Sequence, residues 1–468
     1  MERKQTTNRL ALATLTSLFF MWGFITCMND ILIPHLKELF RLSYLQAMLV
    51  QFCFFGAYFI GSLIYFLISY FKSDPINRIG YKNGILLGLL VSAIGCFLFY
   101  PAAAFVQYGL FLSAFFILGI GFTLLQITAN PFVALLGEQH TASGRLNLVQ
   151  GFNSLGTTIA PILGGYLIFE LFADGTEITG SETKFPYLFF GVVFLLLFIL
   201  VKLVKLPVFK NDDTSALGLG ALRFPQLRLG AIGIFCYVGA EVAIGSFLIN
   251  FLNLPEVGGM SEVVAKNYLS LYWGGAMIGR FLGAISFNSA ISLTKKIVYM
   301  LFVACVITAL IFGIVDLPLQ QAWVFGLLVL GNLLLFYVGR FIASRTLLFF
   351  AMMNVLLILL TVFGPGEVAL WSLVAIGLFN SVMWSNIFTL AISGLKEYTS
   401  QGSSLLVMSI LGGALVPLGQ GAIADYIGLN ESFLLPAVCY LYLVYFGYYC
   451  FRKGLDGSAK TATVSSGH

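Results

Sequence analysis

The sequence predicts an all-α polytopic membrane protein, and three observations support this. Hydrophobic residues make up 59% of the 468 residues and charged residues only 10%, and the mean hydropathy is +0.95, which soluble globular proteins do not approach. Apolar runs of about 20 residues, the length that crosses a bilayer as a helix, recur along the whole chain. Asp30 lies inside the first run, and a carboxylate at membrane depth is costly and marks a transport pathway.

The apolar runs predict fourteen membrane spans. We expect them at residues 10–35, 45–72, 82–104, 107–135, 146–172, 186–206, 229–252, 264–288, 297–315, 321–340, 342–363, 368–392, 403–427 and 433–451. The first run follows basic residues, as in a signal peptide, but it continues into Asn29-Asp30 without a small-residue cleavage site. We therefore interpret it as a retained first span.

The basic residues between the spans predict the orientation. If the N-terminus lies inside, the loops place nearly all Lys and Arg residues on the cytoplasmic side, with the exceptions Lys37, Arg41, Lys184 and Lys266. Both termini are then cytoplasmic. The seven cysteines show no metal-type spacing, so no structural metal is expected.

An internal repeat predicts the domain organisation. The string ending at Gly23 matches the one ending at Gly239, 216 residues later, whereas the strings Gly156 to Pro161 and Gly412 to Pro417 lie 256 residues apart. The larger offset predicts an inserted pair of helices near 297–340. We expect an N-terminal six-helix bundle at 1–207, a cytoplasmic linker at 208–228, a C-terminal bundle with the extra pair at 229–452, and a cytoplasmic tail at 453–468.

Polar side chains are concentrated in a few of the spans. Spans that line a substrate path must present hydrogen-bonding groups, whereas lipid-facing spans need none. Amides, hydroxyls and indole faces suit a neutral, hydroxyl-rich ligand such as a sugar, and no Lys or Arg cluster is present for an anion. The alternative for each amide is a hydrogen bond between helices. The candidate substrate-binding residues are Gln51, Gln126, Asn130, Gln150, Asn153, Glu241, Tyr272, Trp273, Asn380 and Trp384.

Glu241 is the second carboxylate within a span. It lies near the middle of span seven, and Arg280 lies in span eight, which is its antiparallel neighbour. We expect the two side chains to form a structural ion pair. Sugar binding by Glu241 is the second hypothesis.

The chain resembles the major facilitator superfamily, in the fucose:proton symporter branch, and within it the bacterial glucose/galactose transporters. The likeness is carried by Asn29-Asp30-Ile31-Leu32-Ile33-Pro34-His35 and by the strings at 51–58, 148–156, 239–247 and 272–277. The resemblance implies two pseudo-symmetric six-helix bundles, a central sugar site and alternating access in a bacterial inner membrane. It also implies that Asp30 takes part in ion coupling and that Gln150 contacts the sugar.

Two departures from this family affect the expected coupling. Gln126 stands where the fucose symporters have a second coupling carboxylate, and fourteen spans are predicted where the family has twelve. An amide cannot exchange a proton, whereas a sodium ion needs only oxygen ligands, which Asp30, Asn29 and Gln126 carry. Sodium coupling at Asp30 is therefore favoured. Proton coupling through Asp30 and uncoupled exchange stay open.

The prediction is thus a secondary active transporter, with sodium-coupled uptake of a glucose- or galactose-type hexose. Its expected partners are the sugar, the coupling cation (Na⁺ or H⁺) and membrane lipid, without a cofactor or nucleic acid, and a monomer is expected. A proton-coupled sugar symporter and a drug or lipid exporter of the same fold are the alternatives. A membrane-embedded glycosyl-transfer enzyme is the alternative from another class, but its expected catalytic loop is missing, so no enzyme activity is expected.

Overall fold

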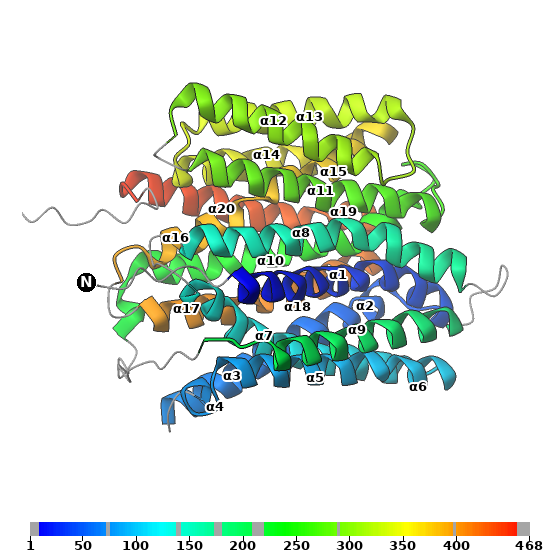
Figure 1. Ribbon diagram of the computed structural model, residues 1–468. Helices are drawn as coiled ribbons and strands as arrows, with labels where there is room; N and C mark the ends of the chain where they lie inside the picture. The colour runs from blue at the N-terminus through cyan, green and yellow to red at the C-terminus, as the bar shows by residue number, and fades with distance from the viewer. Residues whose placement is uncertain are drawn as a thin grey trace, which may run out of the picture.

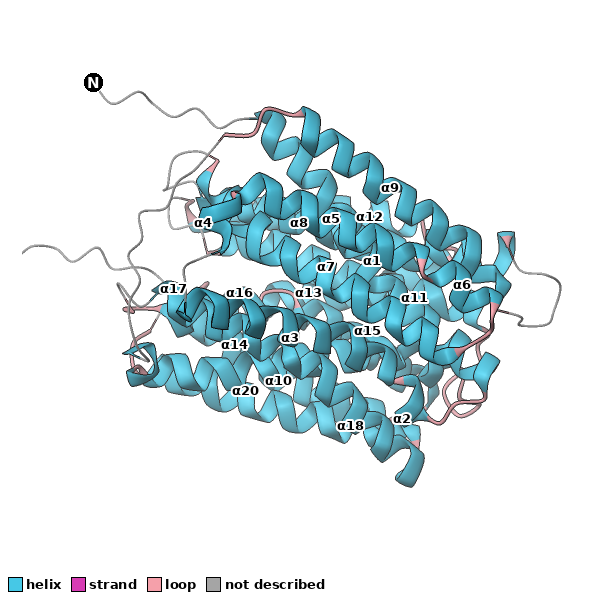
Figure 2. Ribbon diagram, turned by 90° about the horizontal axis from the view of Figure 1, so that it is seen from below, coloured by secondary structure: helices cyan, strands magenta, loops and turns pink. Residues whose placement is uncertain are grey.

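The computed structural model describes residues 9–71, 75–136, 142–172, 180–207, 220–287, 291–395 and 399–455. Helices and short turns account for all regular structure in these ranges, and none of them contains a strand. The long helices run in roughly one direction, with the loops gathered at the two ends of the bundle (Figures 1 and 2). Each helix satisfies its own backbone hydrogen bonds, as a lipid environment demands.

The first half of the chain supplies the helices up to residue 203. Their bounds are α1 (Arg9–Phe40), α2 (Tyr44–Ala47), α3 (Leu49–Phe71), α4 (Pro75–Ile79), α5 (Tyr81–Phe97), α6 (Phe99–Ala104), α7 (Tyr108–Leu135), α8 (Ala142–Tyr166) with the π-turn η2 (Leu167–Leu171), the short turn η3 (Ser181–Thr183) and α9 (Lys184–Leu203). Helix α2 begins with a capping box, in which Ser43 and Gln46 satisfy each other's backbone amides.

The second half begins with η4 (Gly220–Arg223) and continues with longer helices. Their bounds are α10 (Pro225–Leu252), α11 (Glu262–Ser286), α12 (Leu293–Phe312), α13 (Leu319–Val338), α14 (Ala343–Phe363), α15 (Gly366–Asn380), α16 (Met383–Ile392), α17 (Thr399–Met408), η6 (Ser409–Leu411), α18 (Gly412–Ile427), α19 (Leu429–Ser432) and α20 (Leu434–Arg452). Most of the predicted linker and tail, residues 208–219 and 456–468, lies outside the described residues.

The number of membrane spans differs from the prediction. Among the described residues, twelve helices are long and apolar enough to cross a membrane, so the protein is a multi-pass membrane protein. The prediction of fourteen spans with an inserted pair is therefore not supported. The two predicted spans that do not qualify, 146–172 and 264–288, correspond to α8 and α11, each of 25 residues. Polar and charged residues lower the hydropathy of both helices, and some of them, such as Asn153 on α8 and Arg280 on α11, belong to the candidate site.

Helices α12 and α13 lie at the periphery of the bundle, above α14, α15 and α11 in Figure 1. Only 17% and 22% of the residues in their most apolar windows are buried, compared with 78% for α10. Most of their exposed side chains are apolar, as expected of helices that face lipid, and the polar exceptions, Thr294, Lys295 and Gln320, lie near the helix ends. They place no residue in the candidate site described below.

Two helix pairs pack closely through glycines that the repeat had matched. A Cβ atom on Gly156 of α8 would collide with the carbonyl oxygen of Phe20 on α1, and one on Gly412 at the start of α18 would collide with that of Phe235 on α10. Gly23 and Gly239 make the reciprocal close approaches from α1 and α10. Small residues allow membrane helices to approach in this way. The matched strings therefore hold equivalent helix pairs in the two halves.

The two halves of the chain touch at the end of the bundle where α1 ends. Asp425 of α18 accepts hydrogen bonds from the backbone nitrogens of Tyr44 (2.6 Å) and Leu45 (2.8 Å), in the first turn of α2. Lys266 of α11 forms an ion pair with Glu170 of η2 at the same end. Helices α8 and α11 also pack against each other between the halves. These contacts hold the two halves together at this end, beside a cavity that residues of both halves line, among them Lys37 and Asn253.

Candidate functional site

The Asp30 carboxylate lies in a buried cluster of neutral polar groups from three helices. Gln51 Nε2 on α3 donates to Asp30 Oδ1 at 3.0 Å, and Ser246 Oγ on α10 donates to the same oxygen at 3.0 Å. Gln51 Nε2 also lies 2.8 Å from Ser246 Oγ. All three side chains are at most 4% exposed. Because α1 and α3 belong to the first half and α10 to the second, the cluster joins the two halves.

Asn29 fixes the orientation of the Gln51 amide. Asn29 Nδ2 donates to Gln51 Oε1 at 3.5 Å, so Gln51 directs its nitrogen, rather than its oxygen, toward Asp30. The indole of Trp273 lies close to Asp30, because a Cβ atom on Gly245 would lie 3.2 Å from Trp273 Cζ2 and 3.3 Å from Asp30 Oδ2. The Asp30 carboxylate is thus surrounded by hydrogen-bond donors and an aromatic face.

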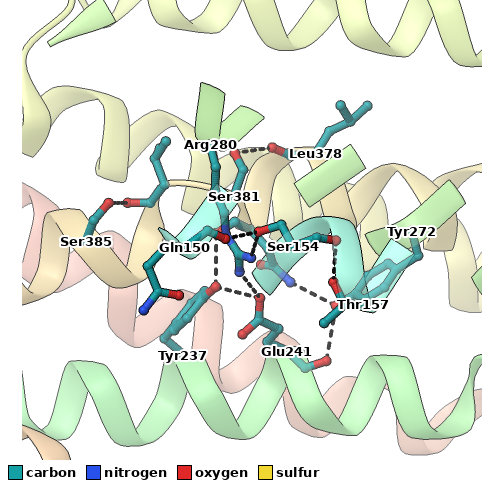
Figure 3. A network of polar contacts seen from close by, with 12 residues as sticks. Gln150, Ser154, Thr157, Tyr237, Glu241, Tyr272, Arg280, Leu378, Ser381 and Ser385 are labelled. Atoms are coloured by element: carbon teal, nitrogen blue, oxygen red, sulfur yellow. Dashed lines mark hydrogen bonds and ion pairs between the residues drawn. The ribbon is translucent and has the colours of Figure 1, made fainter. Parts of the chain in front are cut away.

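Glu241 lies in a second cluster, which consists of second-half residues and reaches α8 of the first half. Tyr237 Oη, one turn earlier on α10, donates to Glu241 Oε1 at 2.7 Å, and Arg280 Nη2 on α11 lies 3.7 Å from the same oxygen. Arg280 also donates to Ser154 Oγ on α8. Figure 3 shows Tyr237 and Glu241 pointing from α10 toward Arg280 and Ser154, with Gln150 beside them. The expected ion-pair partners therefore lie within ion-pairing distance of each other.

Asn380 connects the Glu241 cluster to three further helices. Its Nδ2 donates to Tyr272 Oη at 3.0 Å, and its Oδ1 accepts from Tyr440 Oη (2.6 Å) and Asn354 Nδ2 (2.9 Å). Tyr272 Oη donates in turn to the Glu241 carbonyl at 3.1 Å. Asn380 is fully buried at the last residue of α15. Its hydrogen-bonding groups are thus occupied by neighbouring helices.

The remaining candidates occupy different places. On α7, Asn130 Nδ2 donates to Gln126 Oε1 at 3.1 Å, and both side chains are half-buried. On α8, Asn153 Nδ2 donates to the Phe19 carbonyl at 2.9 Å and so ties α8 to α1, whereas Gln150 is half-buried beside the Glu241 cluster. On α16, Trp384 stacks on Phe388, with ring centroids 5.1 Å apart.

Sequence reasoning missed several hydroxyl groups of these clusters. Ser246, Tyr237, Ser154 and Tyr440 all form side-chain hydrogen bonds to the acidic and amide residues named above or to Arg280. Hydroxyl residues are common in membrane helices and often bond only to their own backbone, so their presence alone is a weak signal. The position of Ser246, within a string rich in small residues on a polar span, was the available indication.

The structure thus defines a helical membrane protein with two buried carboxylate clusters at the junction of its halves. Comparison with known proteins gives its family. The family model of the Major Facilitator Superfamily matches residues 10–417. The chain belongs to this superfamily, whose members named below are transporters and not enzymes.

Relatives with assigned names extend along almost the whole chain. A glucose/galactose transporter of Brucella abortus biovar 1 is 44% identical over 441 residues, which cover 93% of each chain. An L-fucose-proton symporter of Escherichia coli is 30% identical, covering 93% of this chain and 91% of that one. A crystal structure of a variant of the E. coli fucose:proton symporter matches with a TM-score of 0.63 and 28% identity, covering 95% of this chain and 99% of that one. The resemblance seen in the sequence motifs is confirmed.

Proposed function

We propose that the protein is a secondary active sugar transporter, which imports a hexose of the glucose or galactose type together with a cation by alternating access. The observation that carries this proposal is the Asp30 carboxylate, which is buried at the junction of the two halves and bonded to side chains from both. A carboxylate in this position can gain and lose a cation as the halves rearrange. Its ionisation then links ion binding to the movement of the halves.

The sugar is inferred from the polar groups around the two clusters and from the relatives. Three half-buried amides lie on α7 and α8 of the first half: Gln126, Asn130 and Gln150. Amides donate and accept at once, which suits a ligand with several hydroxyl groups. Relatives 44% and 30% identical carry the names of a glucose/galactose transporter and an L-fucose-proton symporter. Gln150 is the first candidate for a sugar contact.

We propose the proton, rather than sodium, as the coupling ion, which revises the expectation from the sequence. A sodium ion requires oxygen ligands, but Gln51 and Ser246 direct an N–H and an O–H group at Asp30. Of the other expected ligands, the Gln126 oxygen accepts from Asn130, whereas Asn29 bonds Gln51 only through its nitrogen and keeps its oxygen without a hydrogen-bond partner among the described residues. Donors around a carboxylate suit a group that alternates between an ionised and a protonated form. The relatives named as proton symporters favour the same ion.

The membrane arrangement is also proposed. The apolar helices and bacterial relatives favour a bacterial inner membrane, and the distribution of basic residues favours cytoplasmic termini. The end of the bundle where α1 ends is then the external end. Residues 1–207 and 229–452 would form the two moving bundles, joined by a cytoplasmic linker at 208–228.

Uptake of labelled glucose and galactose into proteoliposomes tests this function. An inward proton gradient should drive accumulation at equal sodium on both sides, and an inward sodium gradient at equal pH should not. Accumulation with sodium alone would replace the proton as the coupling ion. If neither hexose is transported and a lipophilic cation is transported instead, the protein is an exporter of this fold and the sugar proposal is wrong.

A further inference from the structure

Ser246 is the group of the second half that contacts the Asp30 carboxylate. It is fully buried on α10, its hydroxyl donates to Asp30 Oδ1 at 3.0 Å, and it also accepts from Gln51 Nε2 at 2.8 Å. Gln51, in contrast, lies on α3 in the same half as Asp30. Asp30 therefore has an amide donor from its own half and a hydroxyl donor from the other, and the indole of Trp273 on α11 lies beside it from that other half as well.

The Ser246 contact occurs in a structure whose two halves touch at the external end. Asp425 of α18 accepts the backbone amides of Tyr44 and Leu45, and Lys266 pairs with Glu170, both at the end beyond Asp30. When the halves separate at this end, α10 moves away from α1 and takes Ser246 with it. Gln51 stays with Asp30, because both belong to the first half. The two donors thus respond differently to alternating access.

A hydrogen bond donated to a carboxylate stabilises the ionised form over the protonated form. We propose that Ser246 is a positioning residue for coupling, which donates to Asp30 only when the external end is closed and thereby promotes release of the proton to the cytoplasm. With the external end open, Asp30 lacks this donor and takes up a proton from outside more readily. The proposal rests on the proposed proton coupling and names the group that makes proton release depend on conformation.

The charged and titratable groups that act on Asp30 do not supply this dependence. Cys27 lies one turn away on α1 and moves with Asp30. Glu241 acts on Asp30 from α10, but its charge is opposed by that of Arg280, 3.7 Å away. Farther out, His35 of α1 lies 3.7 Å from Glu182 of η3, which is also in the first half. From the second half, the Ser246 hydroxyl donates to the carboxylate at 3.0 Å, and the Trp273 indole of α11 lies beside it.

The test measures proton-driven sugar uptake while internal and external pH are varied separately. Acid inside the proteoliposome opposes release of the proton and so inhibits uptake. In Ser246→Ala, the internal proton concentration that halves uptake should be about tenfold lower than in the unchanged protein, because loss of one charge-assisted hydrogen bond makes Asp30 hold its proton more tightly. Dependence on external pH should be unchanged. Gln51→Met, which removes the donor in the same half, should shift both dependences together. Ser246→Thr keeps the hydroxyl and should restore the original internal dependence.

The readouts separate this role from a structural one. A Ser246→Ala protein whose internal and external pH dependences are both unchanged, or shift equally, overturns the proposal. If this variant does not fold, judged by sugar counterflow, Ser246→Cys is isosteric with a weaker donor and should shift the internal dependence in the same direction. If the unchanged protein shows no response to a pH gradient, the proposed proton coupling fails, whereas a normal response with an unaltered Ser246→Ala profile refutes this inference alone.

Discussion

The two buried carboxylates of this protein lie in contrasting surroundings. Asp30 is contacted by an amide and a hydroxyl, and in the described part of the chain no Lys or Arg forms an ion pair with it. Glu241 has Arg280 at 3.7 Å and accepts from Tyr237. A paired carboxylate is held in its ionised form, whereas neutral donors leave both forms accessible. From this comparison we propose ion coupling for Asp30 and a structural role for Glu241.

Asp30→Asn is the sharpest way to break this contrast, and we expect the largest effect from it. Asparagine keeps the size and the hydrogen bonding to Ser246, but it cannot bind or release a proton. Accumulation of sugar driven by a proton gradient should be abolished, whereas exchange of sugar across the membrane should continue. Uptake and counterflow in proteoliposomes measure the two. Full retention of accumulation would remove Asp30 from the coupling mechanism.

Arg280→Ala tests the other side of the comparison. It leaves the Glu241 carboxylate mostly buried and without its cation. Removal of one partner from a fully buried ion pair lowers the free energy of unfolding by about 3–5 kcal/mol. We expect about 2 kcal/mol here, because the Arg280 side chain is 26% exposed. Thermal unfolding in detergent should detect the loss. The double variant Glu241→Gln with Arg280→Met should recover most of the stability. If the double variant is as unstable as Arg280→Ala, the pair does not account for the effect.

Gln150→Ala addresses sugar binding beside the Glu241 cluster. Loss of one or two hydrogen bonds to a sugar hydroxyl should raise the apparent KM for sugar about tenfold, with little change in stability, because the Gln150 side chain is half-buried. Initial uptake rates over a range of sugar concentrations give this value. An unchanged KM would argue against a contact between Gln150 and sugar.

Asn153→Ala is a matched control on the same helix, less than one turn away. The Asn153 amide donates to the Phe19 carbonyl and ties α8 to α1, so its removal should lower stability by about 0.6 kcal/mol, the average for hydrogen bonds between membrane helices. The KM for sugar should stay within about twofold of that of the unchanged protein. A rise in KM equal to that of Gln150→Ala would place Asn153 in the sugar site instead.

Several features of the fold could be predicted because they depend on local composition or on matched strings. Hydropathy located the apolar helices, and the repeat identified Gly156 and Gly412, which have equivalent packing roles. The predicted number of membrane spans, fourteen, exceeds the twelve described helices that are long and apolar enough to cross a membrane, because α8 and α11 carry many polar groups. The closeness of Glu241 and Arg280 was expected, since neighbouring antiparallel helices bring such positions together.

The site could be predicted only in part, because its polar contacts depend on how distant helices meet. Ser246 and Asp30 are 216 positions apart in the sequence, and no local sequence pattern predicts that their side chains come into contact. The contact of the Gln51 amide with Asn29 is likewise a tertiary feature, and so is its orientation toward Asp30, on which the proposal of a proton rests. Residue types indicated which spans carry the site, and the packing of the halves decided which groups meet there.

The most direct test of the account is sugar-induced proton movement, measured side by side in proteoliposomes that contain Asp30→Asn or Glu241→Gln. With an internal pH-sensitive dye, addition of sugar outside should acidify the interior for the unchanged protein and for Glu241→Gln, with the same ratio of protons to sugar. Asp30→Asn should move sugar without protons. Proton movement that persists in Asp30→Asn and disappears in Glu241→Gln would reverse the two assignments and contradict the account.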